Sequence, residues 1–282
     1  MSIALVTGTS TGIGLATAVT LARAGHTVYA TMRNPAGGAA EVRAVAQAEN
    51  LPIHVLQLDV NSDESVRETF AHAGPLDVLV NNAGVGGHAS VEEMPLEEFR
   101  SVMETNFFGA LRCIKAALPA MRERRAGLIV NVTSVAGRLA GGAQGAYSAS
   151  KWALEALSES LACEVAAFGI RVAVVEPGVI ATPIFGKSDM RGESIYPHAR
   201  RLDAFFRASL KNPVSPYVVG EAIRDIVAGG NGKLRHPVGP DAAPLIASRA
   251  ATSDEDWIAS QAVSDREWCE RIGRAFGMKI DL

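Results

Sequence analysis

The sequence predicts an α/β protein built on a doubly wound parallel sheet, and three observations lead to this fold class. Short runs rich in β-branched residues alternate with longer Ala- and Leu-rich stretches in which apolar residues recur at helical spacing. The short runs are apolar at almost every position, which is typical of strands that are covered by helices on both faces. Right-handed crossovers between such strands produce a doubly wound layer.

Six short runs are expected to form the strands, with helices in the intervals between them. In chain order these runs are Ile3–Thr7, Thr27–Thr31, Ile53–Leu58, Val78–Val80, Leu128–Val132 and Val172–Val175. The sequence contains neither an internal repeat nor a linker that would divide it. We therefore expect a single domain over residues 1–240, followed by a C-terminal extension over residues 241–282.

One region within the domain departs from the alternation of strands and helices. Residues 183–215, approximately, contain no strand-like run. Within them, Leu202, Phe205, Phe206 and Leu210 recur on one face of a predicted amphipathic helix. We expect this region to form a lid; a helix that simply packs on the body is the alternative.

The extension is predicted to be helical. Ser253 and Ser264 each stand three residues before an acidic residue, which is the spacing of helix N-caps. The second of these caps opens a short run with apolar residues on one face. We expect the extension to pack on the body or on a partner subunit.

Charge and composition exclude several classes of partner. The chain has 282 residues, and its 27 Lys and Arg against 30 Asp and Glu give a formal net charge of −3. It contains no block of like charges, which argues against binding to a nucleic-acid backbone or an anionic membrane surface. It also contains no apolar run long enough to span a membrane. We therefore expect no nucleic-acid or membrane partner.

The cysteines and histidines predict neither disulfides nor a metal site. Cys113, Cys163 and Cys269 lie far apart in helix-type sequence, where a buried thiol acts as a small apolar filler. This pattern, with no recognisable targeting segment, favours a reducing compartment, and we expect a cytoplasmic protein. The six histidines show no i, i+4 pairs and no clusters with cysteines or carboxylates, so we expect no metal.

A glycine-rich turn after the first strand predicts a phosphate-binding site. Residues 3–14 read IALVTGTSTGIG, and helix-type sequence follows. Glycine lets the backbone turn tightly and approach a pyrophosphate, whose charge is stabilised at the N-terminus of the next helix. In this position, directly after the first strand of a βαβ unit, the turn indicates a Rossmann-type dinucleotide site.

Further motifs follow in order, and together they resemble the short single-domain branch of the short-chain dehydrogenases/reductases. These motifs are Asn81-Asn82-Ala83-Gly84, Asn106 in TNFFG, Ser134 in NVTSVAG, Tyr147-x-x-x-Lys151 in YSASK, and Pro177-Gly178-Val179 followed by Thr182. The resemblance covers residues 2–182 well and residues 215–240 loosely, whereas the lid and the extension match little.

The resemblance implies an oxidoreductase that interconverts an alcohol and a ketone or aldehyde, with Tyr147 as general acid/base. It also implies that Lys151 binds the nicotinamide ribose and that Asn106 holds a water linking Lys151 to solvent. Ser134 is expected to stabilise the substrate oxygen, and it is preferred over Thr133 for its spacing of thirteen residues to Tyr147.

Tyr147 and Lys151 are four residues apart in a predicted helix, so they share one face. A unit charge at roughly 4 Å contributes about 4 kcal/mol at an effective dielectric of about 20. We therefore expect the Lys151 ammonium to lower the pKa of the Tyr147 phenol towards the range that is useful for proton transfer.

The resemblance also assigns the cofactor-binding residues. Asp59 is expected to meet the adenine, the Asn82 segment to line the channel, and Thr182 with the backbone of Val179 to meet the nicotinamide carboxamide. Besides Tyr147 and Lys151, the expected set is Gly8, Thr11, Gly12, Ile13, Gly14, Arg33, Asp59, Val60, Asn82, Ala83, Gly84, Pro177, Gly178, Val179 and Thr182.

The end of the second strand favours NADP(H), with NAD(H) as the alternative. An NAD enzyme is expected to place Asp or Glu there, to accept hydrogen bonds from the ribose hydroxyls. This chain has Met32 followed by Arg33, whose guanidinium suits a 2′-phosphate, and Thr11 adds a hydroxyl. Arg33 as a solvated surface residue, or as one that merely stacks on the adenine, is the competing interpretation.

The predicted substrate rim favours a small apolar alcohol or ketone. The rim comprises residues 85–88, 138–144 and 184–210, and its apolar members are Ile184, Phe185, Ile195, Phe205 and Phe206. His88 is expected to be a solvated loop residue. By resemblance, a homodimer or homotetramer is expected, with Trp152 and Phe168 offering apolar surface.

Three other functions stay open on the sequence alone. The first is an NAD-dependent dehydrogenase of the same family. The second is epimerisation or dehydration of a sugar nucleotide, against which the chain length and the glycine spacing count. The third is a dinucleotide-sensing protein without turnover, for which the loss of Ser134, Tyr147 or Lys151 would be expected.

Overall fold

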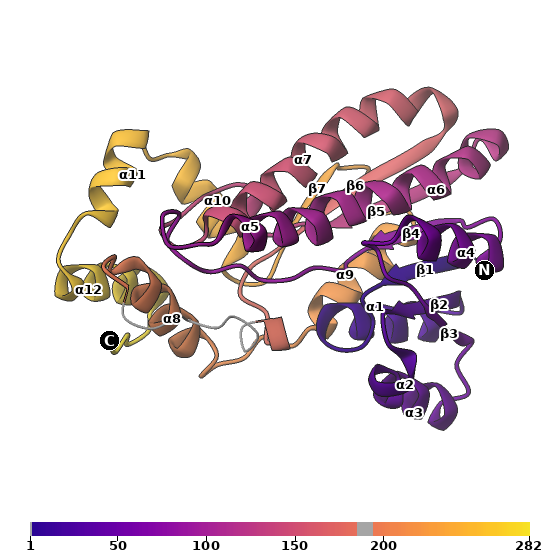
Figure 1. The fold of residues 1–282 in the computed structure, drawn as a ribbon, viewed down its shortest axis with the longest axis horizontal. Helices are drawn as coiled ribbons and strands as arrows, with labels where there is room; N and C mark the ends of the chain where they lie inside the picture. Colours follow the sequence, from indigo (N-terminus) through magenta and orange to yellow (C-terminus); the bar gives the residue numbers. More distant parts are fainter. Residues whose placement is uncertain (1, 185–193) are drawn as a thin grey trace.

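Seven strands form one parallel sheet in this computed structural model, which describes residues 2–184 and 194–282 (Figure 1). The strands are β1 (Ile3–Thr7), β2 (Thr27–Met32), β3 (Ile53–Gln57), β4 (Val78–Asn81), β5 (Gly127–Val132), β6 (Ile170–Pro177) and β7 (Arg235–Val238). They lie in the order β3-β2-β1-β4-β5-β6-β7, and every neighbouring pair is parallel. The predicted doubly wound α/β fold is confirmed.

Five strands lie within one residue of their expected bounds, and the other two differ. β6 begins two residues earlier than expected and ends two residues later, at Pro177. β7 was not expected at all, because it is a short edge strand with the sequence RHPV, in which only Val238 is buried. Edge strands tolerate proline and charge, so they lack the apolar pattern that reveals a central strand.

Helices cover both faces of the sheet. Those of the body are α1 (Gly12–Arg23), α2 (Pro35–Gly38), α3 (Ala40–Ala48), α4 (Asp63–Ala73), α5 (Leu96–Met103), α6 (Gly109–Arg124), α7 (Gly145–Val165) and α9 (Tyr217–Val227). α1 and α9 contact each other on one face, whereas α4, α6 and α7 lie on the other (Figure 1).

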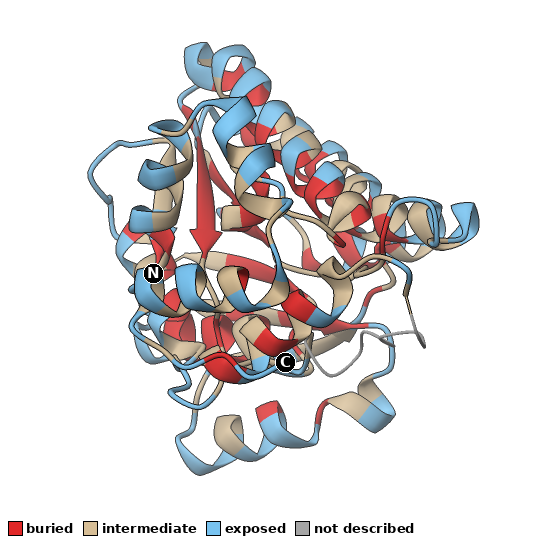
Figure 2. Cartoon of the chain, turned by 90° about the vertical axis from the view of Figure 1, so that its left-hand side faces the viewer, coloured by how far each residue is buried: buried red, intermediate tan, exposed pale blue. Residues whose placement is uncertain are grey.

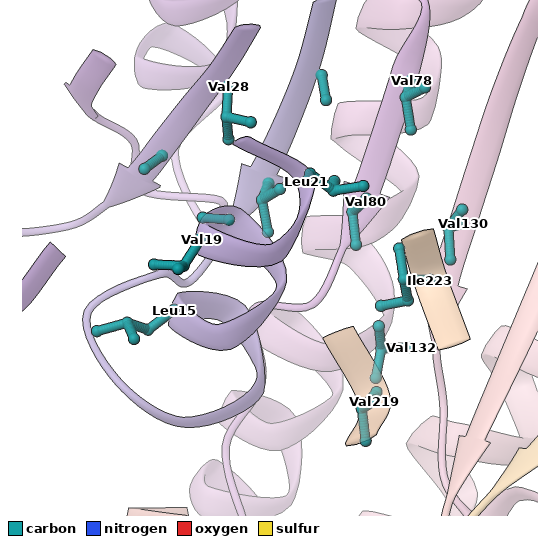
Figure 3. Close-up of a cluster of buried hydrophobic side chains, with 14 of the residues drawn as sticks. Leu15, Val19, Leu21, Val28, Val78, Val80, Val130, Val132, Val219 and Ile223 are labelled. Atoms are coloured by element: carbon teal, nitrogen blue, oxygen red, sulfur yellow. The ribbon is translucent and has the colours of Figure 1, made fainter. Parts of the chain in front are cut away.

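The core consists of two apolar layers, one on each face of the sheet. Along β1, Ala4 and Val6 belong to the layer beneath α1 and α9, whereas Leu5 belongs to the opposite layer, as strand alternation requires. Figure 3 shows the first layer, in which Val19 of α1 and Ile223 of α9 pack near Val80 and Val130. Buried residues are concentrated in the strands and on the inner sides of the helices (Figure 2). The sheet is therefore a rigid base for the side chains at its carboxyl edge.

Four further helices follow β6 and β7 outside the body described above, and two of them, α8 and α12, form a separate apolar cluster. The helices are α8 (His198–Ser209), α10 (Ala242–Ala250), α11 (Asp254–Gln261) and α12 (Asp265–Phe276). α8 and α12 lie side by side (Figure 1), and Ala204 and Ala208 of α8 pack with Trp268. α8 is the amphipathic helix that the sequence predicted, and Ser253 and Ser264 are the N-caps of α11 and α12, as expected.

All three cysteines lie in helices and are unpaired, but only Cys113 is buried. The expectation that each acts as a buried apolar filler is wrong for Cys163, which is exposed because it faces outward from α7. None of the described helices is both long enough and apolar enough to cross a bilayer.

Candidate active site

A cavity of about 480 Å³ opens at the carboxyl ends of the strands. It lies where β1 and β4 are neighbours and the chain order of the sheet reverses, which is the usual ligand position in such sheets. Its lining includes every expected site residue except Asn106, which is buried behind it. The predicted residues, which are scattered over 175 positions of the chain, thus meet at one place.

The glycine turn forms one end of the cavity. Gly8 and Gly12 have φ angles of 72° and 59°, in the left-handed region that favours glycine. A Cβ on Gly14 would lie 2.3 Å from the carbonyl oxygen of Gly8, so the helix can approach the turn only without a side chain. Thr11 is the N-cap of α1, but its side chain makes no capping hydrogen bond. The first-turn N–H groups of α1 therefore suit an anion such as a pyrophosphate.

Asn82 fixes the glycine turn against the end of β4. Its amide Nδ2 donates to the carbonyl oxygens of Thr7 at 2.8 Å and Gly8 at 3.2 Å. In return, the Thr7 hydroxyl accepts hydrogen bonds from the backbone N–H groups of Asn82 and Ala83. The Asp59 carboxylate, which also lines the cavity, accepts a hydrogen bond from the backbone N–H of Asn61. The segment after β4 that carries Asn82 thus holds the glycine turn in place and also forms part of the cavity wall.

Ser134, Tyr147 and Lys151 meet at the centre of the cavity. Ser134, at the end of β5, hydrogen-bonds to the Tyr147 phenol. Lys151 is buried, and its ammonium donates to the carbonyl oxygen of Val132 at 3.0 Å and lies 5.6 Å from the centre of the Tyr147 ring. The neighbouring hydroxyl of Thr133 instead donates to Glu155 at 2.6 Å. The structure therefore places Ser134, and not Thr133, beside the phenol.

The expected direction of the Tyr147 pKa shift is wrong for this structure. Burial raises the pKa of the Tyr147 phenol, and the hydrogen bond with Ser134 lowers it only in part. Desolvation also acts on Lys151: burial lowers the pKa of its ammonium to about 8, although nearby Glu155 acts in the opposite direction. The sequence argument considered the charge of the lysine but not the burial of both groups, and burial dominates here.

Asn106 braces the loop that follows β4. It lies in a π-helical turn, η1 (Glu104–Phe108), a local distortion common at functional sites. Its Oδ1 accepts from the N–H of Val85 at 2.8 Å, and its Nδ2 donates to the Val85 carbonyl and to Ser150 of α7, both at 3.0 Å. A Cβ on Gly84 would be 3.3 Å from Asn106 Oδ1 and 3.7 Å from Lys151 Nζ, so both side chains flank that glycine.

Comparison with known proteins agrees with this geometry. A family model described as short chain dehydrogenase matches residues 2–191. The chain belongs to the short-chain dehydrogenase family. Its members are oxidoreductases, and the match covers the glycine turn, Ser134, Tyr147, Lys151 and the segment up to Thr182.

This short-chain dehydrogenase also resembles individual proteins over most of its length. It is 40% identical over 251 residues to the 3-ketodihydrosphingosine reductase of Bacteroides thetaiotaomicron, covering 84% of this chain and 88% of that one. A crystal structure of a short-chain dehydrogenase from Streptomyces avermitilis has a TM-score of 0.77 at 34% identity, covering 98% of both chains. A Burkholderia cenocepacia short chain dehydrogenase in complex with NADP has a TM-score of 0.73 at 25% identity, covering 93% of this chain and 98% of that one.

Arg33 lies at the edge of the cavity, directly after β2. It follows the buried Met32 at the end of β2, is exposed, and lines the cavity together with the exposed Thr11. Its guanidinium makes no hydrogen bond or ion pair within the described part of the chain. No carboxylate ends or directly follows β2, because Met32 is its last residue and Arg33 and Asn34 come next.

The segment after β6 is held by a residue that the sequence analysis did not identify. The backbone N–H of Val179, which was expected to meet a carboxamide, donates to the Asp241 carboxylate at 2.8 Å. Thr182 lies against the glycine turn, since a Cβ on Gly12 would be 3.1 Å from its Cγ2. No local motif marked Asp241, because its partner is 62 residues away.

The far end of the cavity is apolar and is built largely by α8 and the helices of the extension. Its wall includes Leu202, Phe205, Phe206, Leu245, Trp257, Trp268, Ile272 and Phe276. The indole N–H of Trp257 donates to the carbonyl oxygen of Ala140 at 2.9 Å, which ties α11 to the substrate loop. The sequence analysis expected the extension only to pack on the body or on a partner subunit. Its role in the cavity wall could have been predicted from the apolar face of α12.

Two rim residues do not match their expected roles, and a third cannot be compared. Ile195 is 80% exposed and is not part of the cavity wall, so its inclusion in the rim is wrong. His88 is not a solvated loop residue: its ring lies between Tyr147 and Phe206, with centroid distances of 5.8 and 5.5 Å. Burial lowers the pKa of His88 to about 4. Phe185 lies outside the described residues.

Within residues 2–184 and 194–282, no group of three or more His, Cys, Asp or Glu side chains is placed to hold a metal ion. The site is therefore described by its hydrogen-bonding and apolar groups.

Proposed function

We propose that this short-chain dehydrogenase is an NADP(H)-dependent oxidoreductase that interconverts an apolar ketone or aldehyde and the corresponding alcohol. One observation carries the proposal: the glycine turn, the Ser134–Tyr147–Lys151 group and an apolar chamber line one continuous cavity. A dinucleotide at the turn and an apolar carbonyl compound in the chamber would meet beside Tyr147.

The Tyr147 phenol supplies the proton when a carbonyl is reduced. Because burial raises its pKa, the phenol is protonated at neutral pH and acts as a general acid. In the oxidative direction it first loses this proton, and the Lys151 ammonium beside the ring stabilises the resulting phenolate. Ser134 orients the phenol and donates to the substrate oxygen as negative charge develops there. The bound nicotinamide supplies or accepts the hydride.

The choice of NADP(H) over NAD(H) rests on charge. The first-turn N–H groups of α1 would bind the pyrophosphate, Asp59 the adenine side, and Thr182 with the backbone carbonyl of Val179 the nicotinamide end, since the Val179 N–H is bound to Asp241. Arg33 would pair with the 2′-phosphate, and Thr11 would add a hydroxyl. The Burkholderia cenocepacia relative, which is in complex with NADP, supports this choice.

The apolar chamber supports an apolar substrate. Apart from Gln261, its wall is made of leucine, isoleucine, phenylalanine and tryptophan side chains from α8, α10, α11 and α12. Such a wall gains free energy in proportion to the apolar area that a ligand buries, and it gives no hydrogen-bonding partners to a sugar ring. The relative from Bacteroides thetaiotaomicron, named as a reductase of a keto compound, agrees with this reaction.

We also propose an oligomeric state and a cellular location for this protein. Trp152 on α7 is 49% exposed, so we propose that this face of the helix joins two copies in a homodimer or homotetramer. Phe168, the other residue expected to offer apolar surface, is only half-exposed, with Arg125 over its ring. Three unpaired cysteines support a reducing, cytoplasmic location.

The test is NADPH oxidation with a panel of apolar ketones and, as a contrast, sugars. Tyr147→Phe should lower the rate at least about 100-fold, because the proton donor is lost while the ring stays. Tyr29→Phe, on β2 and outside the cavity, is the matched control and should be unaffected. Binding of NADPH without oxidation across the whole panel would favour the sensing protein. Equal use of NADH would favour the NAD-dependent alternative.

A further inference from the structure

A group of buried charges lies directly behind the Tyr147–Lys151 pair. Glu155, one helical turn beyond Lys151 on α7, is only 4% exposed, and Lys151 is 5% exposed. Glu176, on β6, is fully buried. Buried charges of this kind are costly unless they are paired, so each of them calls for a partner.

The Glu155 carboxylate is held from two sides. Its Oε1 accepts from the Thr133 hydroxyl at 2.6 Å, and its Oε2 accepts from Arg235 Nε, on β7, at 3.0 Å. The backbone of Gly137 closes the third side, since a Cβ there would be 3.0 Å from Glu155 Cγ and 3.2 Å from the Lys151 carbonyl oxygen. The carboxylate is therefore fixed one helical turn along α7 from Lys151 and shielded from solvent.

The positively and negatively charged side chains around Lys151 are equal in number. Arg138 donates to Glu176 at 2.9 Å, and Arg235 Nη2 also binds Glu159, at 2.6 Å, on the exposed side of α7. Three cations (Lys151, Arg138 and Arg235) thus face three carboxylates (Glu155, Glu159 and Glu176). On the cavity side, the titratable groups are Tyr147 and His88, whose ring centroids are 5.8 Å apart. Arg138 is paired with Glu176, and Arg235 is shared between Glu155 and Glu159. Glu155 is also the carboxylate one helical turn along α7 from the buried Lys151.

We propose that Glu155 is a positioning residue of this site, whose fixed, buried carboxylate keeps the Lys151 ammonium charged at working pH. The proposal rests on the proposed function only in giving Lys151 a role in turnover. Burial lowers the pKa of Lys151 to about 8, and Glu155 is the group that opposes this effect. Without it, the lysine would lose its proton closer to neutral pH and would no longer stabilise a phenolate or bind a ribose.

The first test is the pH dependence of kcat/KM for ketone reduction. Glu155→Gln keeps the shape and the bond to Thr133 but removes the charge, so the alkaline limb should move down by about one pH unit. Glu159→Gln is the matched control: it binds the same arginine, but its side chain is 61% exposed, and its limb should not move. Glu155→Asp should lie between wild type and Glu155→Gln, which keeps the test usable if the glutamine variant does not fold. A limb that superimposes on wild type in Glu155→Gln, or moves equally in Glu159→Gln, overturns the proposal.

The second test does not need turnover. A lysine with a pKa of about 8 when folded and about 10.4 when unfolded binds fewer protons in the folded state between these values, so stability rises with pH there. Subtracting the urea-unfolding profile of Lys151→Met isolates this rise, which should begin at lower pH in the Glu155→Gln background. An unchanged onset means that Glu155 is only structural. If no ketone is reduced, the proposed function fails, while this profile still tests Glu155.

Discussion

The Asp241 carboxylate, at the start of α10, accepts a 2.8 Å hydrogen bond from the backbone N–H of Val179. Asp241 is the N-cap residue of α10, but its side chain does not cap its own helix. Its other oxygen, Oδ1, is buried and has no hydrogen-bond partner among the described atoms. The start of the extension is thus joined to the segment that carries Val179 and Thr182, and a change at either end should reach the part of the cavity that these two residues line.

Gly178→Ala should disrupt the contact between Asp241 and the segment that carries Val179. A Cβ at Gly178 would lie 2.0 Å from Asp241 Oδ1, far inside contact distance. We expect a loss of about 2 to 3 kcal/mol in the free energy of unfolding, measured with urea, because a packed neighbour must move. Asp241→Ala removes the obstruction, so the double variant should lose less than the sum of the two single losses. Gly141→Ala, where no atom lies within 4 Å, is the control; an equally small effect of Gly178→Ala would contradict the prediction.

Arg33→Ala should weaken NADPH binding selectively. If the guanidinium pairs with the 2′-phosphate, its loss should raise the Kd for NADPH about tenfold or more and leave that for NADH nearly unchanged. Quenching of tryptophan fluorescence measures both constants. Arg43→Ala, an exposed arginine of α3 outside the cavity, should change neither. Equal losses for both cofactors from Arg33→Ala would reject the 2′-phosphate assignment and favour stacking on the adenine.

The central strands and the cofactor end of the site were predictable because their signals are local. A buried parallel strand such as β1 must be apolar throughout, and the glycine turn, Ser134 and the Tyr147–Lys151 pair each belong to a short motif. The edge strand β7 was not predictable, because nothing at a sheet edge requires an apolar run.

The chamber and the proton chemistry were harder to predict because they depend on tertiary contacts. Trp268 joins the cavity wall through its packing on α8, which is some 60 residues earlier in the chain. The direction of the Tyr147 pKa shift depends on how deeply the phenol is buried, and residue spacing carries no information about burial. Asp241 reaches Val179 across 62 residues for the same reason.

His88 should make the protein less stable in mild acid. Its pKa is about 4 in the folded chain against about 6.5 unfolded, so between these values the unfolded chain binds more protons and stability falls as pH falls. The free energy of unfolding should fall by about 3 kcal/mol at most between roughly pH 7 and pH 4, the range that spans the two pKa values of His88. Urea unfolding at a series of pH values measures this loss. His88→Phe should remove this part of the slope, whereas His72→Phe, exposed on α4, should keep it. Identical slopes for wild type and His88→Phe would contradict the burial of this ring.

Arg201 should determine the use of large apolar substrates. It is 3% exposed, and from α8 it donates to Asp265 at 2.8 Å and to the carbonyls of Gln261 and Val263 at 2.9 and 2.6 Å. These bonds fasten the turn between α11 and α12 beneath the lid, so their loss should leave buried carbonyls unpaired and loosen the chamber wall. Arg201→Ala should therefore raise the KM for a long-chain ketone about tenfold and hasten limited proteolysis of the extension.

Arg200 provides the matched control, because it binds the same Asp265 from an exposed position, with 58% of its side chain accessible. Arg200→Ala should change the KM for the long-chain ketone by less than about twofold, as is usual for surface ion pairs. In Arg201→Ala, the KM for a small ketone and the Kd for NADPH should stay near wild type, since Arg201 does not line the cavity and its hydrogen bonds go to the turn between α11 and α12. An equal loss with small and large ketones would mean that the substitution disturbs the catalytic centre itself, and the chamber would then have no separate role in substrate choice.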